Sequence, residues 1–186
     1  MSSDPAGQAG DLRRRRASSA ALPYPGRALI TRLDHVAVCV RDPRPAAQLW
    51  GELLGGRFVQ GVPDWRGFSF IQFEYPNGSR LEIISPASDR TGFAATFLAR
   101  RGEGLHHVTF MTDDLAVELE RLRGTGYRVV DEDYADPQWQ EAFLSPSSAH
   151  GVLVQLAQSS LTQEEQDARW GGEPLEKVLE LAARFA

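Results

Sequence analysis

Four side chains at matched positions in the sequence could together hold a divalent metal ion. His35 and His107 each lie in an apolar run of alternating polarity, and Glu82 and Gln155 each lie in a later run of the same kind. The separations are 82 − 35 = 47 and 155 − 107 = 48 residues. Two imidazoles, a carboxylate and an amide oxygen suit octahedral Co, Mn, Ni or Fe(II) with two positions left open. Zinc suits the set less well, because it more often takes four ligands.

Each of these residues also has an interpretation that involves no metal. A lone histidine on a strand is more often a half-buried hydrogen-bonding residue than a ligand. Glu82 could face solvent by simple alternation, in which case Leu81 and Ile83 would face the site. Because neighbouring side chains on a strand point to opposite faces, we expect only one of His106 and His107 to serve. His107 is chosen because it aligns with the histidine of the first run.

The candidate ligands belong to a unit that occurs twice in the chain. Residues 33–38 resemble residues 105–110, and both read as strands. Each run is followed by a turn containing Asp, a segment with helical spacing of apolar residues, and a glycine-containing stop. Further alternating runs close each half. The sequence therefore predicts an α+β fold in which two tandem βαβββ modules form a curved mixed sheet with a cleft, where equivalent positions converge.

The repeat divides the chain into five expected segments. These are a disordered tail over 1–28, a first βαβββ module over 29–88, a linking helix over 89–103, a second module over 104–158 and C-terminal helices over 159–186. The tail contains a four-arginine run but is too short of apolar residues for a secretory signal. Thr162 and Glu165 predict a capping box at the start of the first C-terminal helix. The C-terminal helices are expected to cover a sheet edge or a dimer contact.

Composition excludes several classes of protein. The chain has 186 residues, of which 42% are hydrophobic, and a net charge of −5, which argues against a nucleic-acid surface. No apolar stretch approaches the length of a membrane span. The single cysteine, Cys39, excludes an internal disulfide and a cysteine-based zinc motif. We therefore expect a cytoplasmic protein, as a homodimer, whose partner is a small molecule.

Aromatic residues are expected to wall the cleft. Trp65, Phe70, Trp139 and Phe143 fall on strands and turns near the candidate ligands. Core packing is the common role for an aromatic residue on a strand. Trp65 and Trp139 lie in loop-like contexts, which makes them the better candidates for contact with a substrate.

The stretch over residues 97–108 carries a family resemblance. A helix ending in two arginines leads into Gly-Glu-Gly-Leu-His-His, and residues 33–38, 81–86 and 143–156 match as well. The sequence resembles the vicinal-oxygen-chelate superfamily, and within it the methylmalonyl-CoA epimerases, over roughly residues 31–158. The resemblance implies a metal that binds two substrate oxygens and stabilises an enolate. It also implies a glutamate that removes the proton alpha to a carbonyl, which here is Glu82.

Two features depart from the epimerase pattern. In those enzymes the closing strand of the second module carries the glutamate and that of the first carries a glutamine, whereas here Glu82 comes first and Gln155 second. The amide of Gln155 does not accept a proton near neutral pH, and the nearest other acid in the first module is Asp64. The segment over residues 134–140 is acidic and aromatic where the epimerases are glycine-rich. It is therefore poorly suited to bind the phosphate groups of CoA.

Three functions fit these residues. The first is a metal-dependent isomerase, epimerase or lyase that works through an enolate, with Glu82 as single base and an oxo-acid, acyl-CoA or natural-product intermediate as substrate. The second is an Fe(II) dioxygenase that uses His35, His107 and Glu82 as a two-His-one-carboxylate site. In the superfamily's ring-cleaving dioxygenases, however, the carboxylate comes from the position of Gln155. The third is a ligand-sequestering protein of the resistance type, a class that usually lacks the full ligand set.

Overall fold

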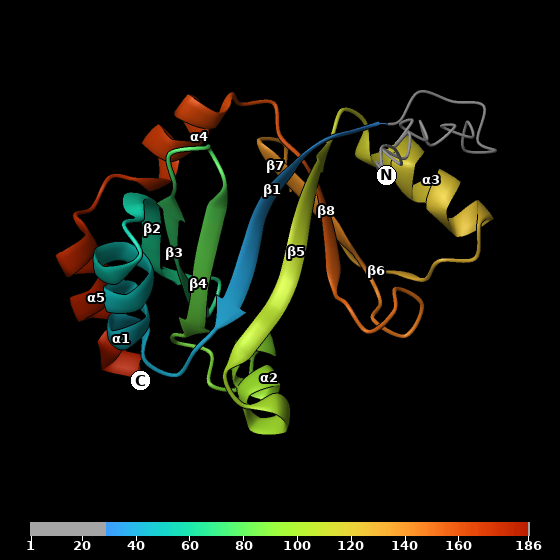
Figure 1. The fold of residues 1–186 in the computed structure, drawn as a ribbon. Helices are drawn as coiled ribbons and strands as arrows, with labels where there is room; N and C mark the ends of the chain where they lie inside the picture. The colour runs from blue at the N-terminus through green and yellow to red at the C-terminus, as the bar shows by residue number, and fades with distance from the viewer. Residues whose placement is uncertain (1–28, 186) are drawn as a thin grey trace, which may run out of the picture.

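One curved eight-stranded sheet organises the protein (Figure 1). The computed structural model describes residues 29–185, so the predicted disordered tail lies outside the described residues. The strands of the first half are β1 (Ile30–Cys39), β2 (Arg57–Trp65), β3 (Phe68–Glu74) and β4 (Arg80–Pro86). Those of the second half are β5 (Gly104–Thr112), β6 (Val129–Asp136), β7 (Trp139–Leu144) and β8 (Val154–Gln158).

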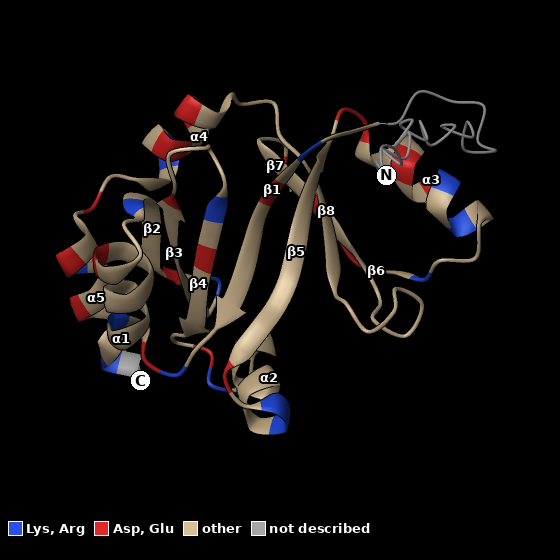
Figure 2. Ribbon diagram, viewed as in Figure 1, with Lys and Arg blue, Asp and Glu red and all other residues tan. Residues whose placement is uncertain are grey.

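Helices connect and cover the strands. They are α1 (Pro43–Ala47), which continues as a π-helix over Gln48–Leu53, then α2 (Phe93–Arg101), α3 (Leu115–Gly124), α4 (Gln163–Trp170) and α5 (Leu175–Ala182), which ends in a 3-10 turn over Ala183–Phe185. None of the helices in the described part of the chain combines the length and the apolar character that a bilayer crossing requires. On α3 the acidic residues come first and the basic residues lie in the last turn, α4 and α5 carry charges of both signs, and the central strands are mostly uncharged (Figure 2).

The strand order confirms the predicted repeat. The order is β2-β3-β4-β1-β5-β8-β7-β6, with β1 parallel to β4 and β5 parallel to β8. The two halves join where β1 and β5 run antiparallel through the middle of the sheet (Figure 1). Each half is therefore a βαβββ module, and the expected curved mixed sheet with a helical C-terminal part is present.

The helices decide which face of the sheet carries the site. Val178 and Leu179 of α5 pack with Ile83 of β4 in one buried cluster, and Leu81 belongs to the same cluster. Since side chains alternate along a strand, Glu82 must point to the other face, away from these helices. The alternative in which Glu82 faces solvent and Leu81 and Ile83 face the site is therefore excluded, because Glu82 is buried and both apolar residues pack against the helices.

Two local expectations differ from the structure. The apolar face predicted for the first helix is largely open, with Leu49 43% and Leu53 71% exposed. The π-helical turn there winds more residues per turn than an α-helix, so apolar residues at a 3.6-residue spacing do not stay on one face. Trp139, which was expected in a loop-like context, begins strand β7 and pairs with Asp136 at the tip of the β6–β7 hairpin.

Candidate metal centre

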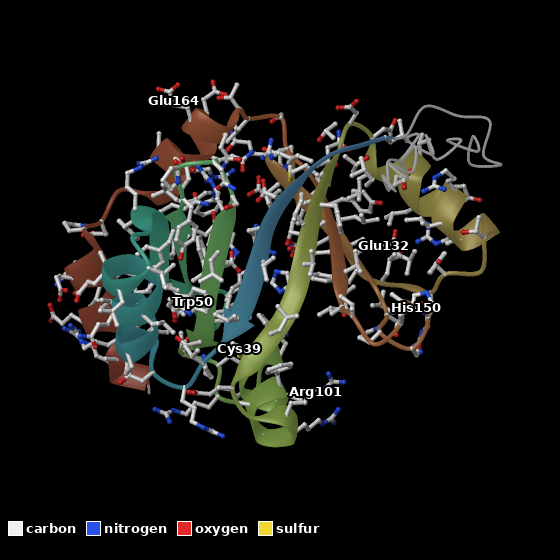
Figure 3. All side chains as sticks on the ribbon, in the orientation of Figure 1. Cys39, Trp50, Arg101, Glu132, His150 and Glu164 are labelled. Carbon is white, nitrogen blue, oxygen red and sulfur yellow. The ribbon has the colours of Figure 1, made fainter. Side chains whose placement is uncertain are left out.

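Three buried side chains meet at the junction of the two modules. One ligand atom from each of His35, Glu82 and His107 lies within 4.8 Å of the other two. The sheet explains this meeting, since Ala37 of β1 is paired with Glu82 on one side and with His107 on the other. His35 lies two residues before Ala37, on the same face of the strand. Side chains from β4, β1 and β5 crowd this central part of the sheet (Figure 3).

His35 is held by a neighbouring carboxylate. Its Nδ1 atom lies 2.8 Å from Oδ2 of Asp34, and its Nε2 atom lies 3.5 Å from Oε2 of Glu82. An Nδ1–H that donates to Asp34 makes Nε2 the nitrogen that would bind a metal, as is usual for metal-bound histidines. The β1–β5 pairing shifts register at Asp34, which allows two consecutive side chains to lie together.

Asp34→Asn is expected to weaken metal binding without removing a ligand. Burial raises the pKa of the Asp34 carboxyl, but the hydrogen bond and charge of His35 outweigh it and hold this pKa down at about 2. Asn keeps the shape but not the charge, so metal affinity should fall by roughly 10–100-fold. Calorimetric titration with Co(II) measures this, with Asp64→Asn as the matched control. An unchanged affinity would show that Asp34 does not orient the histidine.

His107 carries an unpartnered nitrogen at the centre of the site. Its Nε2 atom is buried and has no hydrogen-bond partner among the described residues. Its ring centroid lies 5.5 Å from that of His35. Burial, together with the charges of His35 and His106, lowers its pKa well below the ordinary value, so its imidazole is neutral at physiological pH. A neutral imidazole with a free buried nitrogen is what a metal ligand requires.

Strand alternation predicted that His106 points away from His107, and this prediction is wrong. The two Nδ1 atoms are 2.8 Å apart, and both rings line the same cavity. The cause is a second register shift in the β1–β5 pairing, between Ala37 and Val38, which places an extra residue on β5. His106 packs its ring against Phe97, with 4.8 Å between centroids, and so shields the metal centre on this side.

Glu82 ends a chain of buried amides. Gln60 donates to Gln72 at 2.7 Å, and Gln72 donates to Oε2 of Glu82 at 2.9 Å. Burial raises the pKa of Glu82, the charge of His35 opposes this, and the charge of Glu141 adds to it. The carboxyl group therefore holds a proton more readily than a free glutamate does, which suits a group that must accept one.

Gln155 reaches the same cavity from β8. Its Oε1 atom accepts from the Thr109 hydroxyl at 2.5 Å, and that hydroxyl lies 3.0 Å from Nε2 of His35. Its Nε2 atom donates to Oε2 of Glu141 at 2.6 Å, which fixes the orientation of the amide. The amide of Gln155 is thus directed toward the histidines.

Glu141 is a site residue that the sequence analysis missed. Its carboxylate accepts from Gln155 and, at 2.7 Å, from Nε1 of Trp139, and it lines the cavity. A signal for it existed in the sequence. Trp139, Glu141 and Phe143 alternate along β7, so two aromatic residues expected in the cleft require the acid between them to face it too.

The site opens into one cavity of about 490 Å³. All eight residues predicted for the metal or the pocket line it: His35, Glu82, His107, Gln155, Trp65, Phe70, Trp139 and Phe143. Trp170 and Gln166 of α4 also line it, although the C-terminal helices were expected at a sheet edge or a dimer contact and not at the cleft. The site offers a nitrogen from each of His35 and His107 and a carboxylate oxygen from Glu82, and the Nε2 atom of His107 has no hydrogen-bond partner among the described residues. This set of donors fits a divalent ion.

Known proteins resemble this chain in sequence over the two modules. The family described as the glyoxalase/bleomycin resistance protein/dioxygenase superfamily matches residues 34–143. The ethylmalonyl-CoA/methylmalonyl-CoA epimerase of Cereibacter sphaeroides is 29% identical over 137 residues, which cover 70% of this chain and 99% of the relative. The mitochondrial methylmalonyl-CoA epimerase of Bos taurus is 28% identical over 133 residues, covering 69% of this chain and 74% of the relative.

Solved structures resemble this chain in fold as well. The methylmalonyl-CoA epimerase of Mycobacterium tuberculosis superposes with a TM-score of 0.65 at 26% identity, covering 75% of this chain and 95% of that one. An epimerase variant from Streptomyces coelicolor, in complex with 2-nitronate-propionyl-CoA, has a TM-score of 0.61 at 25% identity, covering 71% and 99%. The family match covers more than half of the sequence, so the chain belongs to the glyoxalase/bleomycin resistance protein/dioxygenase superfamily, as its resemblance to the vicinal-oxygen-chelate enzymes implied.

Proposed function

We propose that this protein is a metal-dependent isomerase, epimerase or lyase that removes a proton alpha to a carbonyl and passes through an enolate. The observation that carries the proposal is the convergence of His35, Glu82 and His107 at one end of a cavity. The relatives named as epimerases support the reaction class. His35, Glu82, His107 and Gln155 would hold the ion, and the mixed donor set favours Co, Mn, Ni or Fe(II) over Zn.

Glu82 and Gln72 have different roles in the proposed reaction. A divalent ion in this site supplies Lewis-acid stabilisation of the negative charge that develops on the substrate oxygens. Glu82 accepts the proton on a carboxylate oxygen, and its raised pKa favours this role. Gln72 donates a hydrogen bond to Glu82 and so keeps the carboxylate in one orientation while it is charged.

Glu141 supports the epimerase within this group of reactions. An epimerase removes a proton from one face of the substrate carbon and returns a proton to the other, so it uses two acid–base groups. Glu82 comes from the first module and Glu141 from the second, and both line the cavity. We therefore infer that Glu141 serves as the second group, in place of the acid that we sought in the first module.

Metal content and proton exchange test the proposal together. Protein purified without a chelator should contain about one Co, Mn, Ni or Fe per chain. It should also catalyse solvent deuterium incorporation at the carbon next to the carbonyl, which is C3 of a 2-oxo acid and C2 of an acyl-CoA ester. A metal-loaded protein that exchanges no alpha proton from either substrate class would overturn the proposal.

An Fe(II) dioxygenase is the second candidate, because the three clustered groups are two histidines and one carboxylate. The measurements of metal content and deuterium exchange also distinguish a dioxygenase from an enzyme that works through an enolate. Iron as the bound metal, with substrate turnover that requires oxygen and leaves no deuterium in recovered substrate, would favour the dioxygenase. Protein that binds no metal would favour the sequestration role.

Metal affinity should fall steeply as the pH is lowered. Burial opposes a charge on His35, but the carboxylates of Glu82 and Asp34 outweigh it and raise the pKa of His35, and burial raises that of Glu82. Both groups thus hold protons more tightly than free side chains, and metal binding must displace these protons. Affinity for Co(II) at about pH 5.5 should be lower than at about pH 8 by roughly 100-fold or more. A titration that gives equal affinities would contradict this expectation.

A further inference from the structure

The cavity has a polar end and an aromatic end. The candidate metal ligands and Gln72 form the polar end. Seven aromatic side chains also line the cavity, and four of them pack in one cluster, the aromatic end, which consists of Trp65, Phe68, Phe70 and Trp170. At the aromatic end, Trp65 and Trp170 meet edge to face with 4.5 Å between ring centroids, and Phe70 meets Trp170 at 6.0 Å. Arg66 lies over the Trp65 ring and Arg169 over the Trp170 ring. A flat apolar group placed here would contact the ring surfaces that still line the cavity, which is a favourable arrangement for another aromatic ring.

Trp170 comes from outside the region that matches the family. It lies at the end of α4, beyond residue 143, where the family match ends. The α4 helix begins with the predicted capping box of Thr162 and Glu165, which the structure confirms. The aromatic end of the cavity is therefore completed by the C-terminal extension of this chain and not by the two modules alone.

Several contacts hold α4 in place over the cavity. Arg80 of β4, buried and only two residues from Glu82, donates to both carboxylate oxygens of Asp167, at 2.6 and 2.7 Å. Gln166 is buried, and its side chain donates to the backbone carbonyl of Leu161 at 3.2 Å. At Gly171, a Cβ atom would lie 2.8 Å from the carbonyl oxygen of Val59, so the helix end packs directly on β2. These contacts fix Trp170 as part of the cavity wall.

The charges near the cavity disfavour a polyanion such as the phosphate groups of CoA. Arg66 is the one basic residue among the arginines and lysines that lines the described cavity, and it pairs with Asp133 of β6. Arg169, next to Trp170, pairs with Asp136 of the same strand at 2.7 Å. Asp131 of β6 also lines the cavity. Arginines that already have carboxylate partners offer little attraction to phosphate.

We propose that the substrate is a compact 2-oxo or 2-hydroxy acid that carries an aromatic ring, and that the protein selects against acyl-CoA esters. This inference rests on the proposed function for the placement of the two oxygens at the metal end. The ring lies in the cavity against the packed surface of Trp65, Phe70 and Trp170. The cavity of about 490 Å³ falls within the usual range for the pocket of one small molecule.

Calorimetric titration of the full-length Co(II)-loaded protein tests the inference with three probes: phenylpyruvate, pyruvate and methylmalonyl-CoA. Phenylpyruvate should bind at least about tenfold more tightly than pyruvate, because only it carries a ring, and more tightly than the CoA ester. Trp170→Ala should lower the affinity for phenylpyruvate by about tenfold and leave that for pyruvate unchanged. Trp50→Ala is the matched control, since Trp50 lies on the helical side of the first module (Figure 3) and does not line the cavity.

If Trp170→Ala does not fold, as judged by circular dichroism, Trp65→Ala gives the same comparison. The inference is overturned if phenylpyruvate binds no more tightly than pyruvate, or if methylmalonyl-CoA binds more tightly than both. Its failure is distinct from that of the proposed function. Tight phenylpyruvate binding without deuterium exchange contradicts the enolate chemistry alone, and deuterium exchange into methylmalonyl-CoA without phenylpyruvate binding contradicts the aromatic substrate alone.

Discussion

Replacing Glu82 with glutamine should lower the rate of alpha-proton exchange by about 10²–10⁴-fold, the usual contribution of a general base. Glutamine keeps an oxygen that can bind metal but cannot accept the proton. The variant should therefore still bind Co(II) when the metal is supplied in excess. Exchange is followed by mass spectrometry or NMR in deuterium oxide, with the metal content of each sample measured in parallel.

Glu120→Gln is the matched control for this variant. Glu120 is exposed on α3 and lies away from the cavity, so the same change of charge there should leave exchange unaffected. If Glu82→Gln with bound metal exchanges protons as fast as the unaltered protein, then Glu82 is a ligand only. The base would then have to be sought elsewhere, and Glu141 would be the first residue to test in the same way.

Replacing His107 with leucine should remove the stability that a bound metal adds and should change the stability of the metal-free protein little. In the unaltered protein, a metal at about 100 times its dissociation constant adds about 2.7 kcal/mol of stability, which corresponds to roughly 5–10 °C in Tm. The variant should lose this gain entirely. Its metal-free stability should stay within about 1 kcal/mol of the original, because the loss of the contact between Nδ1 of His107 and Nδ1 of His106 is offset by the removal of the buried, unpartnered Nε2 atom.

Thermal unfolding with and without Co(II) measures both effects. His150→Leu provides the control, because His150 is exposed in the turn before β8 and should leave the metal-induced gain in place. A His107→Leu variant that Co(II) still stabilises by the full amount would show that the ion binds without this residue. A metal-free variant that is several kcal/mol less stable would instead indicate that His107 is a core residue.

The repeat made most of the fold predictable from the sequence. Equivalent histidines on the opening strands and equivalent carboxamide and carboxylate residues on the closing strands indicated that the modules pack symmetrically, and the sheet order bears this out. The cluster of His35, Glu82 and His107 follows from the same symmetry. Period-two alternation along β4 could not by itself decide the direction of Glu82, because that depends on the α1 and α5 helices that cover the opposite face.

The features that escaped prediction depend on backbone irregularity or on contacts between distant segments. His106 turns toward His107 because of a register shift that strict alternation cannot represent. The approach of α4 to the cavity depends on the ion pair between Arg80 and Asp167, residues 87 positions apart in the chain. Neither has a local sequence signal, whereas Glu141 did have one, in the alternation of β7.

The antiparallel pairing of β1 with β5 has a consequence for how the molecule unfolds. The candidate ligands are divided evenly across this seam, with His35 and Glu82 on one side and His107 and Gln155 on the other. An ion held by all four residues would cross-link the two halves, because neither half could unfold without releasing the ion. Local opening of the seam would then cost nearly as much free energy as global unfolding, and the two halves would behave as one cooperative unit. If either module lost its two ligands, the metal link between the two halves would be lost as well.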